Sequence, residues 1–172
     1  MKYSFVVIAF NEQENIVACI ESILALQELG KSFEILIMDD GSKDRTTELV
    51  KTLSETEGRI KLITDGRNHG RGYGRWRGVR SSTGEYVVMV DADVILPKDW
   101  LANCLKHIKD YDIVGGVAVP DGDVAYVYRR FQLQPKVVVG STTITGNNGL
   151  YKRAVFAKLN FDKNLRDGED VD

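Results

Sequence analysis

Two aspartates one residue apart, Asp91 and Asp93, follow the strongest strand pattern in the chain. Residues 87–90 form a continuous apolar and mostly β-branched run, which is typical of a strand buried on both faces of a parallel sheet. Because side chains alternate along an extended chain, both carboxylates are expected to point the same way. Two such charges about 4 Å apart repel by roughly 4 kcal/mol at an effective dielectric constant of about 20. The pair therefore invites a divalent cation, and its hard oxygen ligands favour Mg²⁺ or Mn²⁺.

The same pair has a simpler explanation as turn residues and helix caps ahead of Pro97, because Asp is common where strands end. A DxD pattern is too short to exclude this alternative. Polar turns also follow two earlier strand patterns, at residues 11–14 and 39–44. The carboxyl ends of parallel strands meet at one edge of a sheet, where α/β proteins bind their ligands. That edge is the predicted site.

The turn at residues 39–44 contains two adjacent aspartates, in the sequence DDGSKD. Ser42 or Asp44 suffices to cap the following helix, a contact worth about 1 kcal/mol, and we assign that role to Asp44. A double Asp is more than a cap needs. A ligand contact is therefore predicted for Asp39 or Asp40.

Residues 66–80 have the most unusual composition in the chain, because glycines and arginines are interleaved throughout. The glycines do not match the dinucleotide fingerprint, since Arg75 stands where GxGxxG requires its third glycine. A solvated basic helix face and a nucleic-acid patch containing Tyr73 and Trp76 are two explanations. The nucleic-acid explanation is weak and no such partner is expected, because the chain has a net charge of −2. A cradle of arginine forks and backbone amides beside a metal-bound diphosphate would explain both residue types.

Strand and helix patterns alternate through most of the 172 residues. This order predicts a single α/β domain with a mostly parallel central sheet flanked by helices. An apolar content of 43% and a charged content of 28% describe a globular protein. Residues 120–141 have no clear pattern. The strands are predicted at residues 5–10, 33–38, 59–64, 87–90 and 112–119.

The cysteines and the apolar runs bear on the compartment. Cys19 and Cys104 lie in helix patterns without CxxC or Cys/His spacing, and they are interpreted as small buried hydrophobic residues. The apolar run at the amino terminus is too short for a signal peptide, and no run reaches the length of a membrane span. A cytoplasmic protein is expected, with association at the inner face of the cell membrane through further parts as an alternative.

Five motifs occur in a fixed order: VVIAFNEQENI, IMDDGSKDRT, GRNHGRGYGRWRG, GEYVVMVDADV and a terminal GEDVD. Each is common alone, but the ordered set resembles the family 2 inverting glycosyltransferases, which have the GT-A fold and use nucleotide-sugar donors. The resemblance covers nearly the whole chain. It favours the metal-binding explanation of the DxD pair over the turn explanation.

The resemblance implies roles for residues within these motifs. Asp91 would contact the ribose, and Asp91 and Asp93 would bind Mg²⁺ or Mn²⁺ on the diphosphate. Asp170, in the terminal motif, would be the catalytic base. The donor is expected to be a UDP or GDP sugar. The residues implied in donor binding are Ala9, Phe10, Glu12, Asp40, Arg71 and Asp91.

The acceptor side is implied by the GNNG sequence, which resembles the loop that precedes the acidic motif in this family. Asn147, Asn148 and Glu169 are its candidate residues, and the acceptor is expected to be a saccharide, a lipid-linked or another hydroxyl compound. Asp170 would take the proton of the acceptor hydroxyl, which attacks the anomeric carbon and inverts it. Residues 1–95 would bind the nucleotide and residues 96–172 the acceptor. Family members continue beyond the acidic motif, so the catalytic domain is expected to end early.

Two alternatives belong to other functional classes. A nucleotide-sugar-binding module without turnover would share the donor site, and binding without transfer would identify it. A haloacid-dehalogenase-like phosphatase is the other, because VVMVDADVI resembles the nucleophile motif of that family. It fits less well, since that family places its nucleophile on the opening strand and has Thr or Val where Ile95 stands.

Overall fold

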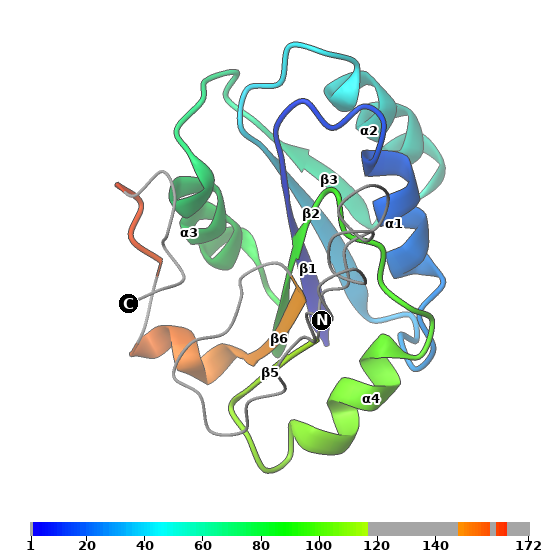
Figure 1. Cartoon of the computed structure of the whole chain (residues 1–172), viewed down its shortest axis with the longest axis vertical. Coiled ribbons are helices and arrows are strands. Elements are labelled where there is room, and N and C mark those ends of the chain that lie inside the picture. The colour runs from blue at the N-terminus through cyan, green and yellow to red at the C-terminus, as the bar shows by residue number, and fades with distance from the viewer. Residues whose placement is uncertain (1, 117–147, 159–160, 165–172) are drawn as a thin grey trace, which may run out of the picture.

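A computed structural model describes residues 2–116, 148–158 and 161–164 (Figure 1). Within these residues one six-stranded sheet has the order β3-β2-β1-β4-β6-β5. The first four strands along the chain are mutually parallel, whereas β6 is antiparallel to both β4 and β5. The predicted α/β class with a mostly parallel sheet is therefore confirmed. The strands are β1 (Tyr3–Ala9), β2 (Phe33–Asp39), β3 (Ile60–Ile63), β4 (Tyr86–Asp91), β5 (Ile113–Gly115) and β6 (Asn148–Lys152).

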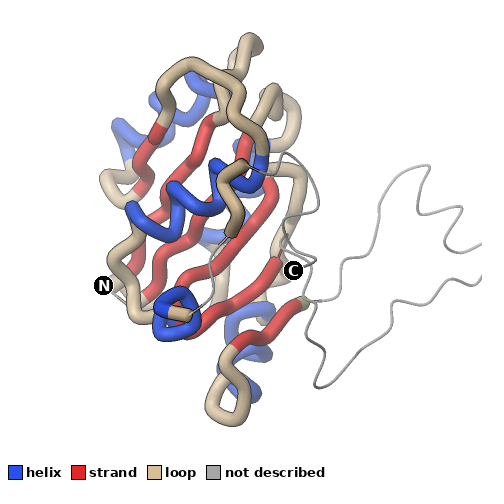
Figure 2. The backbone as a smooth tube through the Cα atoms, turned by 90° about the vertical axis from the view of Figure 1, so that its left-hand side faces the viewer, coloured by secondary structure: helices blue, strands red, loops and turns tan. Residues whose placement is uncertain are grey.

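Helices cover both faces of the sheet. One face carries α1 (Ile16–Leu24), α2 (Thr46–Thr56) and α4 (Trp100–His107). The other carries α3 (Arg71–Ser81) and the short 3₁₀ helix η1 (Arg153–Ala157), the side from which Figure 2 is viewed. In the described part of the chain, no helix has both the length and the apolar character that crossing a membrane requires.

The central strands are buried and mostly apolar because each of their faces meets a helix layer. Every position of β1 is buried: Phe5 and Val7 pack toward α1 and α2, and Val6 and Ile8 pack toward α3. Two buried faces explain why the strand sequences are continuous apolar runs rather than alternating ones.

The order of the strands reverses between β1 and β4, and we call the edge of the sheet where these two strands end the crevice. The chain steps outward from β1 to β2 and β3, then crosses back so that β4 pairs with the free side of β1. Ile8 lies opposite Asp91 in this pairing, and Ala9 lies opposite Asp39 in the pairing of β1 with β2. Such a reversal of strand order is where open α/β sheets bind ligands.

The glycines of α3 allow this helix to approach the sheet closely. A Cβ atom on Gly78 would lie 2.2 Å from Cγ1 of Val6, and one on Gly74 would lie 3.4 Å from Cδ1 of Ile8. Gly74 and Gly78 therefore serve helix packing, whereas the diphosphate cradle expected for residues 66–80 stays a prediction. Gly70 stands ahead of the helix with a φ of 93°, a conformation that suits glycine.

A buried carboxylate ties the strands together at the end of the sheet opposite the crevice. Glu34 is 1% exposed and accepts hydrogen bonds from Ser4 Oγ at 2.8 Å, Thr83 Oγ1 at 2.7 Å and Lys61 Nζ at 3.0 Å. Burial alone raises the pKa of Glu34, but the bonds from Thr83, Lys61 and Ser4 outweigh it and lower the pKa to about 2.

The lowered pKa makes the stability of the fold dependent on pH. The charged form of Glu34 contributes fully above its unfolded pKa of about 4.5, and this contribution is lost as the pH falls toward 2. We expect Glu34→Gln to lower the free energy of unfolding at pH 7 by about 2 kcal/mol, because buried donors lose a charged acceptor. Urea unfolding at pH 7 and pH 3 measures both effects. A difference between wild type and Glu34→Gln that does not shrink at pH 3 would contradict this explanation.

Candidate functional site

The turn after β1 is locked to the turn after β2 by hydrogen bonds in both directions. The backbone N–H of Asn11 donates to Ser42 Oγ at 2.9 Å, and that of Lys43 donates to Asn11 Oδ1 at 2.7 Å. The N–H of Glu12 donates to Thr46 Oγ1 at 2.8 Å. Asn11 has a φ of 57°, which Asn tolerates better than most residues. The two turns therefore form one rigid rim.

Asp44 belongs to this rim and also serves the start of α2. Its carboxylate accepts the backbone N–H groups of Thr46 and Gln13, each at 3.0 Å. Thr46 is the first residue of α2, so the helix-start role predicted for Asp44 is confirmed, although Arg45 occupies the cap position itself.

The two adjacent aspartates at the end of β2 have separate backbone partners. Asp39 closes its own turn by accepting the N–H of Gly41 at 3.1 Å, and it also accepts Thr64 Oγ1 at 2.8 Å. Asp40 accepts the N–H groups of His69 at 2.7 Å and Gly70 at 2.9 Å, and so fixes the backbone that begins α3. Both carboxylates thus have structural partners. The nucleoside contact predicted for Asp40 stays a prediction.

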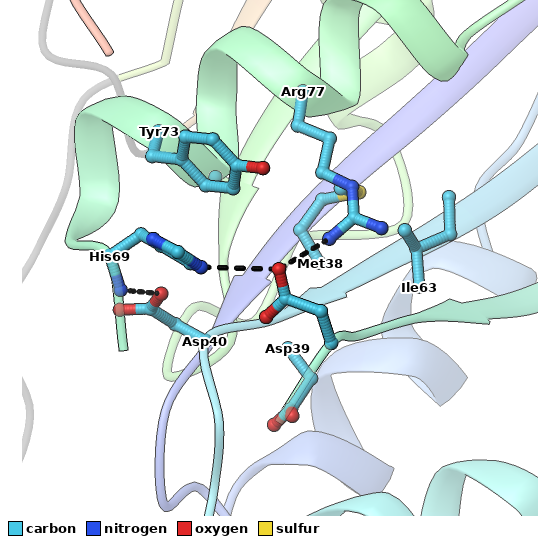
Figure 3. A pocket seen from close by; sticks show the side chains of 9 residues that line it. Met38, Asp39, Asp40, Ile63, His69, Tyr73 and Arg77 are labelled. Carbon is cyan, nitrogen blue, oxygen red and sulfur yellow. Dashed lines mark hydrogen bonds and ion pairs between the residues drawn. The ribbon is translucent and has the colours of Figure 1, made fainter. Parts of the chain in front are cut away.

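A pocket lies where the ends of β2 and β3 meet α3 (Figure 3). The rings of His69 and Tyr73 are in tilted contact, with centroids 4.3 Å apart and an angle of 35° between their planes, and His69 Nε2 lies 3.1 Å from Asp65 Oδ2. A hydrogen bond from the backbone of Arg67 and the charges of His69 and Arg77 lower the pKa of Asp65. The pocket thus combines an aromatic wall with fixed polar groups. Its lining residues are Met38, Asp39, Asp40, Ile63, Asp65, His69, Tyr73, Gly74 and Arg77.

Four of these lining residues, Asp65, His69, Tyr73 and Arg77, were not predicted as site residues. Tyr73 and Arg77 lie four residues apart in α3 and share one face of that helix, whereas Asp65 and His69 precede it. Because residues 66–80 were interpreted through their glycines and arginines, this spacing was overlooked.

The DxD pair does not continue the strand as an extended segment. β4 ends at Asp91, and the N–H of Val94 donates to the Asp91 carbonyl at 3.0 Å, which closes a turn. The strand alternation used to align the two carboxylates therefore stops at Asp91, and that reasoning was wrong. Asp91 is only partly exposed, whereas Asp93 is exposed to solvent.

Asp91 forms a buried ion pair with α3. Arg75, which is 1% exposed, places Nη2 3.0 Å from Asp91 Oδ1. Burial raises the pKa of Asp91, the guanidinium of Arg75 opposes this, and the charge of Asp93 raises the pKa further. Arg71, exposed in the first turn of α3, also acts to lower it.

The carboxylates of Glu12, Asp91 and Asp93 lie close enough to the Cys19 thiol to affect its pKa. Burial raises the pKa of the Cys19 thiol to about 12, and the charges of Asp93, Asp91 and Glu12 act in the same direction. Cys19 Sγ lies 3.7 Å from the Asp91 carbonyl oxygen. Both cysteines are buried free thiols, as expected.

The donor set fits a cation that arrives with a phosphate ligand. No three His, Cys, Asp or Glu side chains in the described ranges converge on a metal-sized site. Mg²⁺ is usually held by only one or two carboxylates together with substrate phosphates, so a complete protein cage is not required. Asp91 and the exposed Asp93 could supply these carboxylates.

The remaining predicted residues differ in their exposure, and three of them lie outside the described residues. Ala9 is buried and acts through its carbonyl, which accepts the N–H of Asp40 at 2.9 Å. Phe10 is 45% exposed at the crevice rim. Glu12 is half-buried and accepts Asn15 Nδ2 at 2.8 Å. Asn147, Glu169 and Asp170 lie outside the described residues.

Asn148 was predicted in a turn on the acceptor side, but it begins strand β6 and is 4% exposed. The assignment of this position to a turn is wrong, because the backbone of β6 pairs with both β4 and β5. Its contact with an acceptor stays a prediction.

The curated proteins that this chain resembles include two that carry the name undecaprenyl-phosphate 4-deoxy-4-formamido-L-arabinose transferase. The one from Pectobacterium carotovorum subsp. carotovorum (strain PC1) is 33% identical over 117 residues, which cover 66% of this chain and 36% of the relative. The one from Pseudomonas aeruginosa (strain LESB58) is 30% identical over 126 residues, covering 72% and 37%. The chain thus spans little more than a third of these relatives.

Solved structures with the same fold include a mannosyltransferase and the protein TarS. The mannosyltransferase PcManGT from Pyrobaculum calidifontis, solved with GDP-Man and Mn²⁺, has a TM-score of 0.75 and 25% identity, covering 98% of this chain and 49% of its own. TarS 1-349 of S. aureus has a TM-score of 0.73 and 23% identity, covering 99% and 53%, and it shows the fold alone. The predicted GT-A fold is confirmed.

The sequence profile of glycosyl transferase family 2 matches residues 4–163, which includes every strand of the sheet except the first residue of β1. The match contains the rim, the pocket and the DxD turn described above. The chain therefore belongs to glycosyl transferase family 2.

Proposed function

We propose that the chain carries the catalytic domain of a metal-dependent inverting glycosyltransferase, which moves a sugar from a nucleoside diphosphate sugar to an acceptor hydroxyl. The main support is the position of Asp91 and Asp93 at the crevice between β1 and β4, next to a pocket with an aromatic wall. Residues 1–95 bind the donor in this proposal, and residues 96–172 belong to the acceptor side.

The donor nucleoside occupies the region between the rim and α3. Phe10 offers an exposed ring there, and Tyr73 lines the neighbouring pocket. The backbone at Ala9 and the carboxylates of Glu12 and Asp40 supply polar contacts. The mannosyltransferase PcManGT, whose structure contains GDP-Man and Mn²⁺, supports a donor of this kind.

The diphosphate lies toward the DxD turn, where positive and negative groups meet. Asp93, with Asp91 behind it, holds Mg²⁺ or Mn²⁺, and Arg71 reaches the phosphates from the start of α3. When bound, the cation neutralises the charge that develops on the leaving diphosphate.

The transfer is a single displacement. The acceptor oxygen forms a bond to the anomeric carbon while the bond from that carbon to the phosphate oxygen breaks, and its electron pair leaves with the diphosphate. Asp170 takes the hydroxyl proton as general base. Glu169, Asn147 and Asn148 contribute to the acceptor side. The undecaprenyl phosphate in the relatives' names supports an acceptor that is linked to a lipid.

Calorimetric titration with UDP and with GDP, each with and without Mn²⁺, tests this proposal. We expect one nucleotide to bind at least tenfold more tightly when Mn²⁺ is present, because Asp91 and Asp93 would hold the cation and its charge would offset that of the diphosphate. Binding that is indifferent to Mn²⁺ would contradict metal dependence. If neither nucleotide binds the folded protein, the donor assignment is wrong.

A further inference from the structure

Arg75 links three parts of the molecule that are far apart in the sequence. We propose that it is a positioning residue, which holds the DxD turn through Asp91 and seats the segment beginning at Phe161 that leads toward the acidic motif. The proposal rests on the proposed function. It adds a residue to the site that neither contacts the donor nor belongs to the predicted set.

Arg75 can reach Asp91 because α3 lies close to the sheet. Gly74 and Gly78 bring the helix down over β1, against Ile8 and Val6. From this position the long side chain at 75 reaches the carboxyl end of the neighbouring strand, where Nη2 lies 3.0 Å from Asp91 Oδ1. A guanidinium that is 1% exposed requires a fixed anionic partner, because a buried unpaired charge is very costly. The pair therefore restricts where Asp91 can point.

The other side of the guanidinium meets the carboxyl-terminal part of the described chain. Arg75 Cζ lies 6.0 Å from the centre of the Phe161 ring, within the range of a cation–π contact. Phe161 in turn packs against Phe156 at 6.1 Å, and Phe156 against Tyr151 of β6 at 5.4 Å. An aromatic row thus leads from Arg75 to β6.

The next residue of α3 holds the same segment from outside. Lys163 Nζ lies 5.5 Å from the centre of the Trp76 ring, so residues 161 and 163 contact residues 75 and 76 in turn. This places residues 161–164 beside α3, as Figure 1 shows. Glu169 and Asp170 follow Lys163 within a few residues in the sequence. The buried side chain of Arg75 is therefore in contact with both Asp91 of the DxD turn and Phe161.

A purely structural ion pair and a positioning residue differ in what their loss changes. Loss of a structural pair would lower the stability alone. Loss of a positioning residue would weaken Mn²⁺-dependent nucleotide binding in protein that is still folded, because Asp91 would no longer be oriented. Disturbing Phe161 would then affect the same quantity, since both residues act through one guanidinium.

The test compares Arg75→Met, Arg75→Lys, Phe161→Leu and the double variant Arg75→Met with Phe161→Leu. Arg80→Met is the control. Arg80 is an exposed arginine of the same helix, and its cation–π contact is with the ring of Trp76. Calorimetry with UDP and GDP, with and without Mn²⁺, gives the dissociation constants. Thermal unfolding followed by circular dichroism reports whether each variant is folded.

We expect Arg75→Met to raise the dissociation constant in Mn²⁺ by about 10- to 100-fold, the range of a charge-assisted hydrogen bond, and to change the metal-free value less than threefold. Arg75→Lys should recover part of the loss. Phe161→Leu should raise the dissociation constant in Mn²⁺ about threefold. In the Arg75→Met background the same change should raise it by less, because the effects of coupled residues are not additive. Arg80→Met should match wild type.

The proposal would be overturned if the Arg75→Met variant is folded and binds the nucleotide in Mn²⁺ as tightly as wild type does. If Arg75→Met does not fold, Arg75→Lys decides: a rise of about fivefold or more supports positioning, and an unchanged constant refutes it. Equal effects of Phe161→Leu in both backgrounds would refute the link to residues 161–164. Failure of wild type to bind either nucleotide would instead overturn the proposed function, and this proposal with it.

Discussion

Asp93→Ala is expected to abolish the Mn²⁺-dependent part of nucleotide binding. Asp93 is the exposed member of the DxD pair, so it has access to a cation that arrives with the diphosphate. Without Asp93 the cation would be left with the carboxylate of Asp91 alone, whose charge is already shared with Arg75. Loss of the cation should slow sugar transfer by about 10³-fold or more, since metal stabilisation of a leaving group is worth several kcal/mol.

Asp110→Ala is the matched control for this change, because Asp110 is an exposed aspartate in a turn remote from the crevice. It should bind nucleotide and Mn²⁺ as wild type does. Calorimetry on both variants measures the effect. Retention of Mn²⁺-dependent binding in Asp93→Ala would show that the cation is held elsewhere and would refute the DxD assignment.

The second large effect is expected from one methyl group on α3. Gly78→Ala should lower the free energy of unfolding by about 2 to 3 kcal/mol, because its Cβ would lie 2.2 Å from Val6 Cγ1. Val6 is fully buried and β-branched, so it cannot rotate away easily. Relief requires the helix to move outward.

Gly74→Ala makes the same chemical change four residues earlier and serves as the comparison. Its Cβ would lie 3.4 Å from Ile8 Cδ1, near ordinary contact, so the better helix propensity of Ala should raise stability by up to about 1 kcal/mol. Urea unfolding of both variants gives the difference. Equal changes in the two would mean that α3 is not held against β1 as described.

The predicted strands and the DxD turn were accessible from sequence because they depend on local patterns. The run at residues 87–90 is buried on both faces as expected, and its end meets the ends of β1 and β2. The polar turns therefore gather at one edge, which follows from parallel pairing alone. The phosphatase alternative required the nucleophile on the opening strand, and the family match sets it aside.

The roles of the β2 aspartates were not accessible in the same way. Asp40 accepts two backbone N–H groups from residues about thirty positions later, and no local pattern announces such a partner. Arg75 was grouped with four other arginines by composition, yet burial distinguishes it from the exposed Arg71 and Arg80. Composition does not tell which side of a helix faces the sheet, and so it could not distinguish Arg75 from the other arginines.

The glycines of residues 66–80 illustrate the same limit. Their density suggested a ligand cradle, whereas Gly74 and Gly78 are four apart and face β1. The spacing of four residues between Gly74 and Gly78 predicts that both lie on one helix face, and this pattern favours packing as the role of these two glycines. Asn148 shows the opposite case, because its neighbouring glycines suggested a turn while pairing with β4 and β5 made it a strand.

The central position of β1 also bears on how the chain folds. Tyr3 pairs with Tyr86 across almost half of the chain, so one side of β1 has no partner until β4 has been synthesised and has crossed over. Long-range pairing of this kind is slow to form. A chain interrupted before β4 would present a fully apolar strand with unpaired backbone groups, a template for pairing between molecules. Fragments ending before residue 86 should therefore aggregate during expression, whereas the chain containing β4 should not.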